Sequence, residues 1–138
     1  MAITKETLKP LFDKALDASK NAYAPYSKFP VGAALLMKDG TIITGVNVEN
    51  RSYGLSNCAE RSALFQAITR GYTTFVAIAI ATPKASYAVP PCGACRQVLS
   101  EFAQGDVPVL FGVDFEHASF ATIETLYPYD SLRELAYK

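Results

Sequence analysis

Apolar and polar residues follow one another along the chain in patterns typical of helices and strands. Residues 7–20 carry apolar side chains every three or four positions, which predicts a helix with Pro10 in its first turn. Two apolar runs follow, at 29–37 and 41–48, and they predict a pair of antiparallel strands. The dipeptide Asp39-Gly40 between them is expected to supply the positive-φ positions of a tight hairpin turn.

The second half of the chain alternates predicted helices and strands. After a polar loop at 49–57, the pattern predicts these elements in order: a helix at 58–70 with Gly71 as its C-terminal cap, a strand at 75–81, a Pro-rich loop ending at Pro90-Pro91, a second helix in which Cys95, Val98, Leu99 and Phe102 share one face, and a strand at 107–113. Beyond residue 114 we expect one short strand and one or two short helices. Strands that alternate with helices imply right-handed parallel crossovers, so the predicted class is α/β with helices on the faces of a sheet. No linker is evident, and we expect a single domain over residues 1–138.

Composition narrows the class of protein. Half of the residues are hydrophobic and 19% are charged, which is typical of a folded globular chain. Lys and Arg together number 13, as do Asp and Glu, so no excess of positive charge favours nonspecific binding to nucleic acid. The longest apolar runs, at 31–37 and 75–81, are shorter than the roughly 20 residues of a membrane helix. The first residues do not resemble a secretory signal, so we expect a cytoplasmic, reducing location.

Three cysteines are the first chemical clue, because an odd number cannot all pair in disulfides. They form two groups, Cys58-Ala59-Glu60 and Cys92-Gly93-Ala94-Cys95, and each lies at the predicted start of a helix that follows a strand. Parallel strands bring such helix starts to one edge of a sheet, where α/β proteins bind ligands. Helix N-termini also favour thiolate over thiol. Three converging thiolates predict a zinc site, and three protein ligands leave the fourth position to water, as in catalytic zinc sites.

Other interpretations of the cysteines stay open at this point. An isolated C-x-x-C motif such as Cys92–Cys95 is more often a structural zinc site or a redox pair. A structural site needs a fourth ligand, for which His117 is the remaining candidate of a common type, although its neighbours predict a solvated turn. A redox pair would give no task to Cys58 or Glu60.

Glu60 distinguishes a catalytic site from a structural one. It shares a helical stripe with Ala63, Leu64 and Ala67, so its carboxyl group should point into the core beside the thiols. Burial there would raise its pKa enough to exchange protons with a metal-activated water. The alternative is a capping box with Asn57, in which the carboxylate accepts a hydrogen bond from the N-cap amide. We favour the proton shuttle.

Charge balance predicts a cation beside the metal. Zinc contributes +2 and three thiolates −3, and the resulting −1 would weaken the effect of the metal on the pKa of a bound water. Arg61 and Arg96 each follow a site residue, so either guanidinium could donate to a thiolate sulfur. We expect this of Arg61. For Arg96 a solvated surface charge is equally compatible with the sequence.

Taken together, these motifs resemble one known family. The segments Cys58-Ala59-Glu60-Arg61 and Pro91-Cys92-Gly93-Ala94-Cys95-Arg96-Gln97-Val98-Leu99 are similar to the two zinc motifs of the small cytidine deaminases. Residues 22–35 and 47–50 are also similar to that family. The similarity extends over roughly residues 20–100, which makes a chance match unlikely on motif grounds.

The resemblance implies a three-layer α/β/α sandwich around a mixed central sheet of about five strands. It implies hydrolytic deamination of cytidine and deoxycytidine to uridine and deoxyuridine in pyrimidine salvage, with one zinc ion per subunit of a homotetramer. Cys58, Cys92 and Cys95 would hold the metal. A zinc-activated water would attack C4 of the pyrimidine, while Glu60 takes its proton, passes it to N3 and helps to protonate the departing ammonia.

The resemblance also implies a set of substrate contacts. The backbone N–H of Ala59, at a helix N-terminus, is expected to hold the pyrimidine 2-oxygen, and the ring of Phe29 to pack against the base. Asn47 and Glu49, two residues apart at a strand end, would bind a sugar hydroxyl, whereas the residues alone favour a polar strand edge. Tyr53 is similar to a family position close to a neighbouring subunit's site.

The C-terminal region departs from the family pattern. The family has Leu-Leu-Pro followed three residues later by an aromatic residue that caps a neighbour's site, whereas this chain has Leu126-Tyr127-Pro128 and then Ser131. We expect Tyr127 or Tyr129 to take the place of that aromatic residue.

Three rival functions are compatible with parts of the sequence. A blasticidin S deaminase has the same two zinc motifs, but Phe29, Asn47 and Glu49 favour a nucleoside substrate. An RNA-editing deaminase would be expected to carry a basic face that a chain of zero net charge lacks. A noncatalytic, zinc-stabilised interaction module would use His117 as the fourth ligand and Glu60 as a helix cap.

Overall fold

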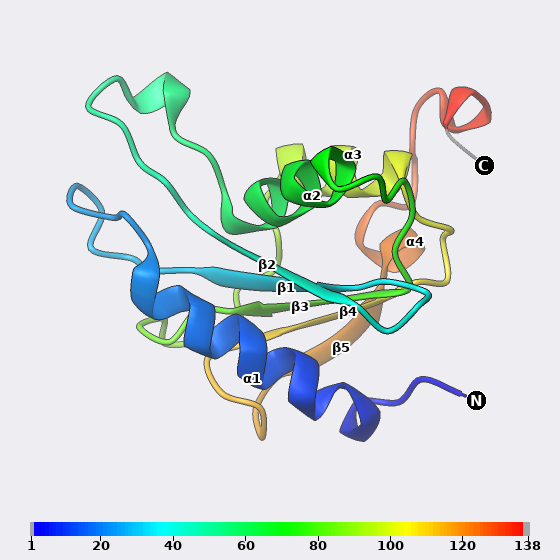
Figure 1. Cartoon of the computed structure of the whole chain (residues 1–138), viewed down its shortest axis with the longest axis horizontal. Coiled ribbons are helices and arrows are strands. Elements are labelled where there is room, and N and C mark those ends of the chain that lie inside the picture. Colours follow the sequence, from blue (N-terminus) through cyan, green and yellow to red (C-terminus); the bar gives the residue numbers. More distant parts are fainter. Residues whose placement is uncertain (1, 137–138) are drawn as a thin grey trace.

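A five-stranded mixed sheet forms the middle layer of the protein (Figure 1). The computed structural model describes residues 2–136. Its strands are β1 (Gly32–Leu36), β2 (Ile42–Val46), β3 (Ala77–Ala81), β4 (Pro108–Gly112) and β5 (Ser119–Thr122), in the spatial order β2-β1-β3-β4-β5. β3 and β4 pair in parallel, and β1 is antiparallel to both of its neighbours, so β2, β3 and β4 run in one direction. The predicted α/β class is confirmed.

Helices cover both faces of the sheet. α1 (Lys9–Ala18) packs on one face, and α2 (Ala59–Thr69) and α3 (Gly93–Glu101) pack on the other, while the short α4 (Ile123–Leu126) follows β5 (Figure 1). This confirms the expected three-layer sandwich, and the short elements after residue 114 are as predicted. Among the described residues, no helix combines the length and the apolar character that a membrane span requires.

Several predicted boundaries differ from the structure for local reasons. The helix expected at 7–20 is α-helical only over Lys9–Ala18 and has a 3-10 turn at each end, with Pro10 in the first turn as predicted. The strand expected at 29–37 begins at Gly32, because Pro30 has no N–H to donate and the side chain of Asn47 takes up the Val31 N–H and the Phe29 carbonyl. Side-chain hydrogen bonds therefore replace strand pairing at the start of β1.

The hairpin turn between β1 and β2 also differs from its prediction. Gly40 has a φ of +90°, but Asp39 does not adopt a positive φ. The Met37 N–H donates to the Thr41 carbonyl at 2.9 Å, so the loop consists of the three residues 38–40 that separate the two predicted strands. The Asp39 carboxylate accepts a hydrogen bond from the Thr41 N–H, and this bond stabilises the three-residue turn.

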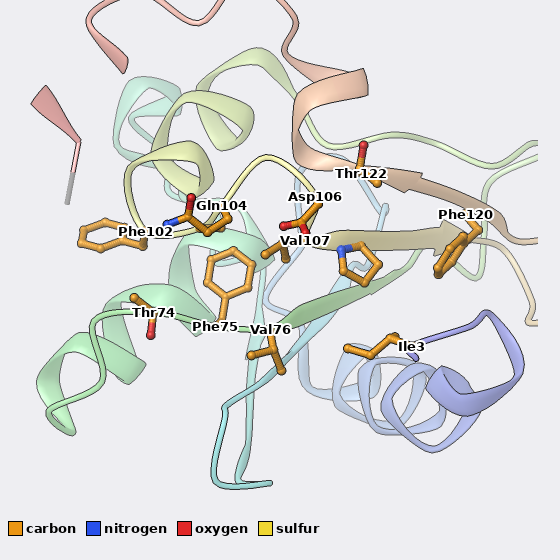
Figure 2. A pocket seen from close by; sticks show the side chains of 12 residues that line it. Ile3, Thr74, Phe75, Val76, Phe102, Gln104, Asp106, Val107, Phe120 and Thr122 are labelled. Carbon is orange, nitrogen blue, oxygen red and sulfur yellow. The ribbon is translucent and has the colours of Figure 1, made fainter. Parts of the chain in front are cut away.

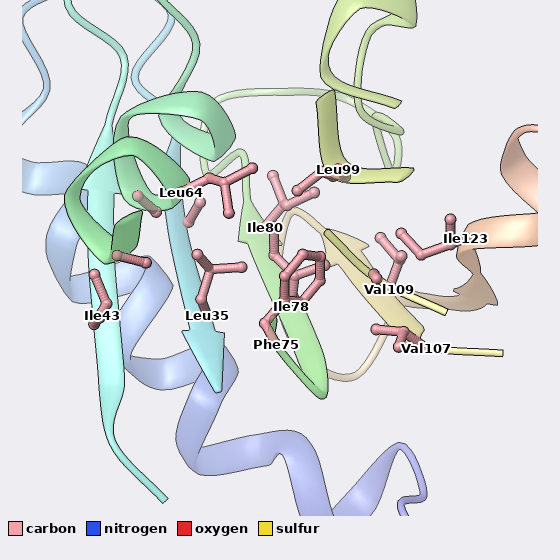
Figure 3. Close-up of a cluster of buried hydrophobic side chains, with 14 of the residues drawn as sticks. Leu35, Ile43, Leu64, Phe75, Ile78, Ile80, Leu99, Val107, Val109 and Ile123 are labelled. Carbon is pink, nitrogen blue, oxygen red and sulfur yellow. The ribbon is translucent and has the colours of Figure 1, made fainter. Parts of the chain in front are cut away.

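The two faces of the sheet bury different side chains, because successive residues of a strand point to opposite sides. Towards α1 the sheet presents mainly alanines, which allow close approach: a Cβ on Gly32 would lie 1.9 Å from the Ala15 carbonyl oxygen. The other face carries the larger core that Figure 3 shows, with Leu35, Ile78 and Ile80 beneath α2 and α3. This larger core supports the two helices that begin with cysteines.

A glycine in β2 sets the position of α2. A Cβ on Gly45 would lie 2.3 Å from the Ala63 nitrogen and 2.7 Å from the Ala59 carbonyl oxygen, so the backbones of β2 and of the first turns of α2 are in direct contact. At its other end α2 stops at Gly71, whose φ of +94° matches the predicted C-terminal cap. The start of α2 is therefore fixed relative to the sheet by close packing.

We expect Gly45→Ala to destabilise the protein by about 1–3 kcal/mol, because the added methyl group overlaps the α2 backbone and can be accommodated only if the helix moves. Chemical denaturation would give the free energy of unfolding. Gly54→Ala is the matched control, since a Cβ on Gly54 meets nothing within 4 Å. Equal stability of the two variants would contradict the close contact.

Candidate active site

Three cysteine sulfurs converge at the carboxyl-end edge of β2 and β3. Cys58 is the N-cap of α2, Cys92 is the N-cap of α3, and Cys95 lies in the first turn of α3. The Sγ atoms of Cys58 and Cys92 are 3.8 Å apart, those of Cys92 and Cys95 are 3.4 Å apart, and all three lie within 4.8 Å of one another. All three thiols are free. The expected convergence of the two cysteine motifs is confirmed.

The spacing of the thiols fits a tetrahedral zinc ion. Zinc–sulfur bonds of about 2.3 Å place the sulfurs of a tetrahedral site roughly 3.8 Å apart, close to the measured 3.4 and 3.8 Å. Among the residues that the structure describes, no histidine, carboxylate or further cysteine joins this group. A donor set of three thiolates is typical of an ion whose remaining ligand is not a protein atom.

His117 lies elsewhere, in the turn between β4 and β5. Its side chain is exposed, and its Nδ1 lies 2.9 Å from Asp114 Oδ1. The structure therefore contradicts the alternative in which His117 completes a structural zinc site.

Arg61 contacts the thiol cluster as expected. Its Nη2 donates to Cys58 Sγ at 3.2 Å, and this hydrogen bond raises the pKa of the guanidinium above its usual range, so the cation stays charged. Its Nε is buried without a protein partner among the described residues, a polar atom left beside a site suited to an ion. With zinc at +2 and three thiolates at −3, the single charge of Arg61 brings the cluster to zero.

Arg96 does not contact a thiolate, and the surface-charge alternative is also wrong. Its Nε donates to the Pro91 carbonyl at 2.8 Å and its Nη1 to the Leu126 carbonyl at 2.7 Å. The side chain therefore ties the segment before α3 to the end of α4.

Glu60 is the buried acid of the site. Its side chain is 4% exposed, and the residue lines the same pocket as Cys58 and Cys92. Burial raises the pKa of Glu60 to about 7 in the metal-free chain, and the charge on Cys58 adds to this effect. The capping-box alternative is wrong, because the N-cap of α2 is Cys58 and no side chain caps the helix; the Asn57 amide donates to Ser62 Oγ instead.

In the metal-free chain the pKa values of Cys58 and Cys95 are shifted in opposite directions. A hydrogen bond from Cys95, followed by the contact with Arg61, lowers the pKa of Cys58 well below its usual range. The pKa of Cys95 is raised, by that same hydrogen bond and by burial. Cys58 is therefore more readily ionised than Cys95, and binding of a metal would displace the proton of Cys95.

A pocket of about 440 Å³ opens above the thiols. Phe29, Val31 and Ile80 contribute to its apolar wall, and Cys58, Ala59, Glu60 and Cys92 contribute to its lining near the metal-binding groups. Its volume is within the range of small-ligand sites, which is about 300–1,000 Å³. The pocket brings together two of the cysteines, the acid and the predicted substrate-binding residues Phe29, Asn47, Glu49 and Ala59.

Asn47 and Glu49 line this pocket beyond the end of β2, but both already hold the chain around it. The Asn47 side chain accepts from the Val31 N–H at 2.8 Å and donates to the Phe29 carbonyl at 2.9 Å. Glu49 accepts from the hydroxyl and the N–H of Ser27 and from the Tyr26 N–H, and these hydrogen bonds lower the pKa of the carboxyl group. Glu49 is therefore a fixed negative charge at the pocket mouth.

The structure does not bring three predicted tyrosines into the pocket of their own chain. Tyr53 is exposed and packs edge-on against Tyr26 in a neighbouring hollow of about 280 Å³. The Tyr127 hydroxyl donates to Gln97 Oε1 at 2.6 Å, and Tyr129 is exposed.

The sequence did not predict that the polar residues Thr82 and Ser27 line the pocket. Thr82 is buried and directly follows the all-apolar β3; a polar residue at the carboxyl end of a parallel strand is the signal that could have identified it. Ser27 lies within a family-like segment, but nothing in its local pattern predicts its hydrogen bond to Glu49, which is 22 residues away.

A larger hollow, of about 550 Å³, lies at the opposite edge of the sheet. Figure 2 shows that Phe75, Phe102 and Phe120 line it together with Asp106. None of the three cysteines lies there. Size alone therefore does not identify the active site.

Known proteins match both the sequence and the fold. Residues 5–111 match the family model of the cytidine and deoxycytidylate deaminase zinc-binding region. The cytidine deaminase of Halalkalibacterium halodurans is 55% identical over 102 residues, which are 74% of this chain and 76% of the relative. The blasticidin-S deaminase of Bacillus cereus is 33% identical over 109 residues, with 74% and 76% covered. The crystal structure of cytidine deaminase from Burkholderia pseudomallei superposes with a TM-score of 0.84 at 42% identity, covering 93% of this chain and 99% of that one.

The three-thiol cluster, the buried acid and the match over residues 5–111 all agree, and the chain belongs to the family of cytidine and deoxycytidylate deaminases. Within that family it is a cytidine deaminase, a hydrolytic enzyme.

We expect Arg61→Gln to shift the titration of Cys58 to higher pH in the chelator-treated protein. The substitution removes a cation and a charge-assisted hydrogen bond from the thiolate, so the pKa of Cys58 rises by about one unit. Alkylation of Cys58 by iodoacetamide, resolved by peptide mass spectrometry across a pH series, measures this. Arg70→Gln is the control, because that exposed arginine lies at the other end of α2, away from the thiols. An unchanged curve for Arg61→Gln would contradict the assigned contact.

Proposed function

We propose that the enzyme deaminates cytidine and deoxycytidine to uridine and deoxyuridine, releases ammonia, and serves pyrimidine salvage with one zinc ion per subunit. The observation that carries this proposal is that Glu60, 4% exposed, lines one pocket of about 440 Å³ together with Cys58 and Cys92, two members of the three-thiol cluster. Such a pairing suits hydrolysis, because the donor set leaves a ligand position to a non-protein atom and a proton carrier lies beside it.

Cys58, Cys92 and Cys95 would hold the zinc. When bound there, zinc supplies a Lewis acid that lowers the pKa of water. Glu60 takes a proton from the attacking water, carries it to N3 of the pyrimidine and then helps to protonate the departing amino group. A pKa of about 7 for Glu60 in the metal-free chain supports this role, because either protonation state would be accessible near neutral pH, although a bound cation would lower that pKa. Arg61 offsets the charge of the thiolates.

The pocket mouth supports a nucleoside as substrate. The Ala59 N–H at the start of α2 would hold the 2-oxygen of the base, and the Phe29 ring would pack against the base. Asn47 and Glu49 would bind sugar hydroxyl groups. No lysine or arginine lines this pocket among the described residues, and the Glu49 carboxylate would repel a phosphate. Deoxycytidylate is therefore a poorer candidate than cytidine.

The rival functions have less support. A blasticidin S deaminase would have the same two zinc motifs. The Asn47 and Glu49 side chains in this pocket, however, favour a nucleoside that offers sugar hydroxyl groups. An interaction module would need His117 at the metal and Glu60 as a helix cap, and neither is in that position.

We further propose a homotetramer of single-domain subunits in the cytoplasm. Phe65 and Ile68 leave apolar surface exposed on α2, and Tyr53 and Leu55 do so in the loop before α2; a second copy could cover both surfaces. Tyr53, and Tyr127 or Tyr129 of another subunit, would then complete the site. Three free thiols suit a reducing compartment. Light scattering measures the mass of the assembly. A mass near four times that of the 14.9 kDa chain would support the homotetramer, and a mass equal to that of a single chain would contradict it.

The function is tested with purified, zinc-loaded protein by the change in ultraviolet absorbance as the amino group is lost. We expect cytidine and deoxycytidine to be converted with a kcat/KM about a hundredfold above that of deoxycytidylate, because the Glu49 carboxylate would repel the phosphate and no described lysine or arginine lines the pocket to bind it. Unchanged cytidine in a fully metal-loaded sample would refute the proposal. Faster turnover of blasticidin S would favour the rival deaminase.

We expect Glu60→Ala to retain stoichiometric zinc and to lower kcat about a thousandfold, because the proton carrier is lost while the thiols remain. Elemental analysis gives the zinc content, and the absorbance assay gives the rate. His117→Ala is the control and should keep both zinc and activity. Loss of zinc from the histidine variant would favour the interaction module.

A further inference from the structure

Residues 24–31 form one side of the pocket entrance, and we call them the mouth segment. Within it, the Ser27 hydroxyl donates to Glu49 Oε2 and accepts from the Phe29 N–H at 3.0 Å. The N–H groups of Tyr26 and Ser27 donate to Glu49 Oε1 at 3.0 and 3.1 Å. Ser27 therefore joins the residue proposed to bind the sugar to the residue proposed to pack against the base.

The backbone of the mouth segment is strained at Lys28. This residue has a φ of +59°, in the left-handed region that residues other than glycine seldom adopt. Its N–H donates to the Ala24 carbonyl at 3.0 Å, which closes a tight turn. The Ser27 hydroxyl spans this strained position, because it is bonded to Glu49 on one side and to the Phe29 N–H on the other. Such strain persists only where the surrounding contacts determine the conformation.

A second side chain holds the other end of the segment. Asn47 accepts from the Val31 N–H and donates to the Phe29 carbonyl, so Phe29 is fixed through both its N–H and its C=O. Only the Ser27 side of this arrangement reaches Glu49. Asn47 makes no hydrogen bond to the carboxylate, and Ser27 supplies two of its three donors, including the side-chain donor.

We propose that Ser27 is a positioning residue that orients Glu49 towards the secondary hydroxyl groups of the nucleoside sugar; this inference rests on the proposed function. A carboxylate at an exposed mouth would otherwise lose rotational freedom on binding. The three donors hold it before the substrate arrives. Each carboxylate oxygen offers more than one acceptor site, and Oε2 accepts only from Ser27, so it keeps capacity for a sugar hydroxyl.

The test uses zinc-loaded Ser27→Ala and two non-reacting ligands, uridine and 2′,3′-dideoxyuridine. We expect the KM for cytidine and the inhibition constant of uridine to rise about tenfold, with kcat within twofold of wild type, because sugar contacts are made equally before and during the reaction. The inhibition constant of dideoxyuridine should change less than twofold, since it has no secondary hydroxyl for Glu49 to bind. A merely structural role for Ser27 would weaken both ligands alike.

Three further variants test the explanation. Ser27→Thr keeps the hydroxyl and should restore the wild-type inhibition constant of uridine. Lys28→Gly in the Ser27→Ala background should recover part of the loss, because glycine adopts a positive φ without strain. Ser86→Ala makes the same chemical change at an exposed serine that does not line the pocket, and it should match wild type.

The outcomes separate this inference from the function on which it rests. If wild type fails to convert cytidine, the proposed function is wrong. If wild type converts cytidine but binds uridine and dideoxyuridine equally, the proposed role of Glu49 is wrong. If wild type prefers uridine but Ser27→Ala weakens both ligands equally or neither, the positioning role of Ser27 is overturned. No recovery by Lys28→Gly would overturn the part of the inference that depends on strain.

Discussion

The structure of the site depends on the meeting of two helix starts. α2 and α3 each begin with a cysteine in extended conformation at the N-cap, and the sulfurs of Cys58 and Cys92 come within 3.8 Å only because both helices leave the same edge of the sheet. The close backbone contact at Gly45 fixes α2, and the side chain of Arg96 ties the start of α3 to α4. A shift of either helix by an ångström would separate ligands whose bonds to zinc are about 2.3 Å long.

Two neighbouring residues in the first turn of α2 differ in how readily they change their charge. Glu60 and Arg61 follow Cys58 directly, yet their surroundings differ. The carboxyl group is buried, which favours its neutral form, whereas the guanidinium is held in its charged form by the sulfur of Cys58. An acid that can change its charge thus lies beside a cation that cannot, and this combination suits proton transfer at a metal whose ligands carry excess negative charge.

The pocket differs in construction between its floor and its mouth. The floor is built on helix ends and on β3, where burial and backbone hydrogen bonds set the geometry. The mouth is a loop, and its shape comes from the side chains of Ser27, Asn47 and Glu49, which bond to backbone groups around a strained Lys28. The floor is held by regular secondary structure, whereas the shape of the mouth depends on a few polar side chains. Substitutions at the mouth would therefore allow relatives to change substrate without changing the cysteine cluster.

The sequence by itself determined most elements and the residues of the cysteine cluster. Cys92 and Cys95 at a helix start, the stripe that contains Glu60, and the stop at Gly71 depend on residues only a few positions apart, and the structure has them as predicted. Strand ends were less predictable, because at β1 a side chain 16 residues away takes up the backbone groups. Tertiary structure alone decided that Arg96 bonds to the Leu126 carbonyl and that Ser27 reaches Glu49. These contacts join residues brought together by strand pairing and helix packing, and local spacing carries no information about such distant partners.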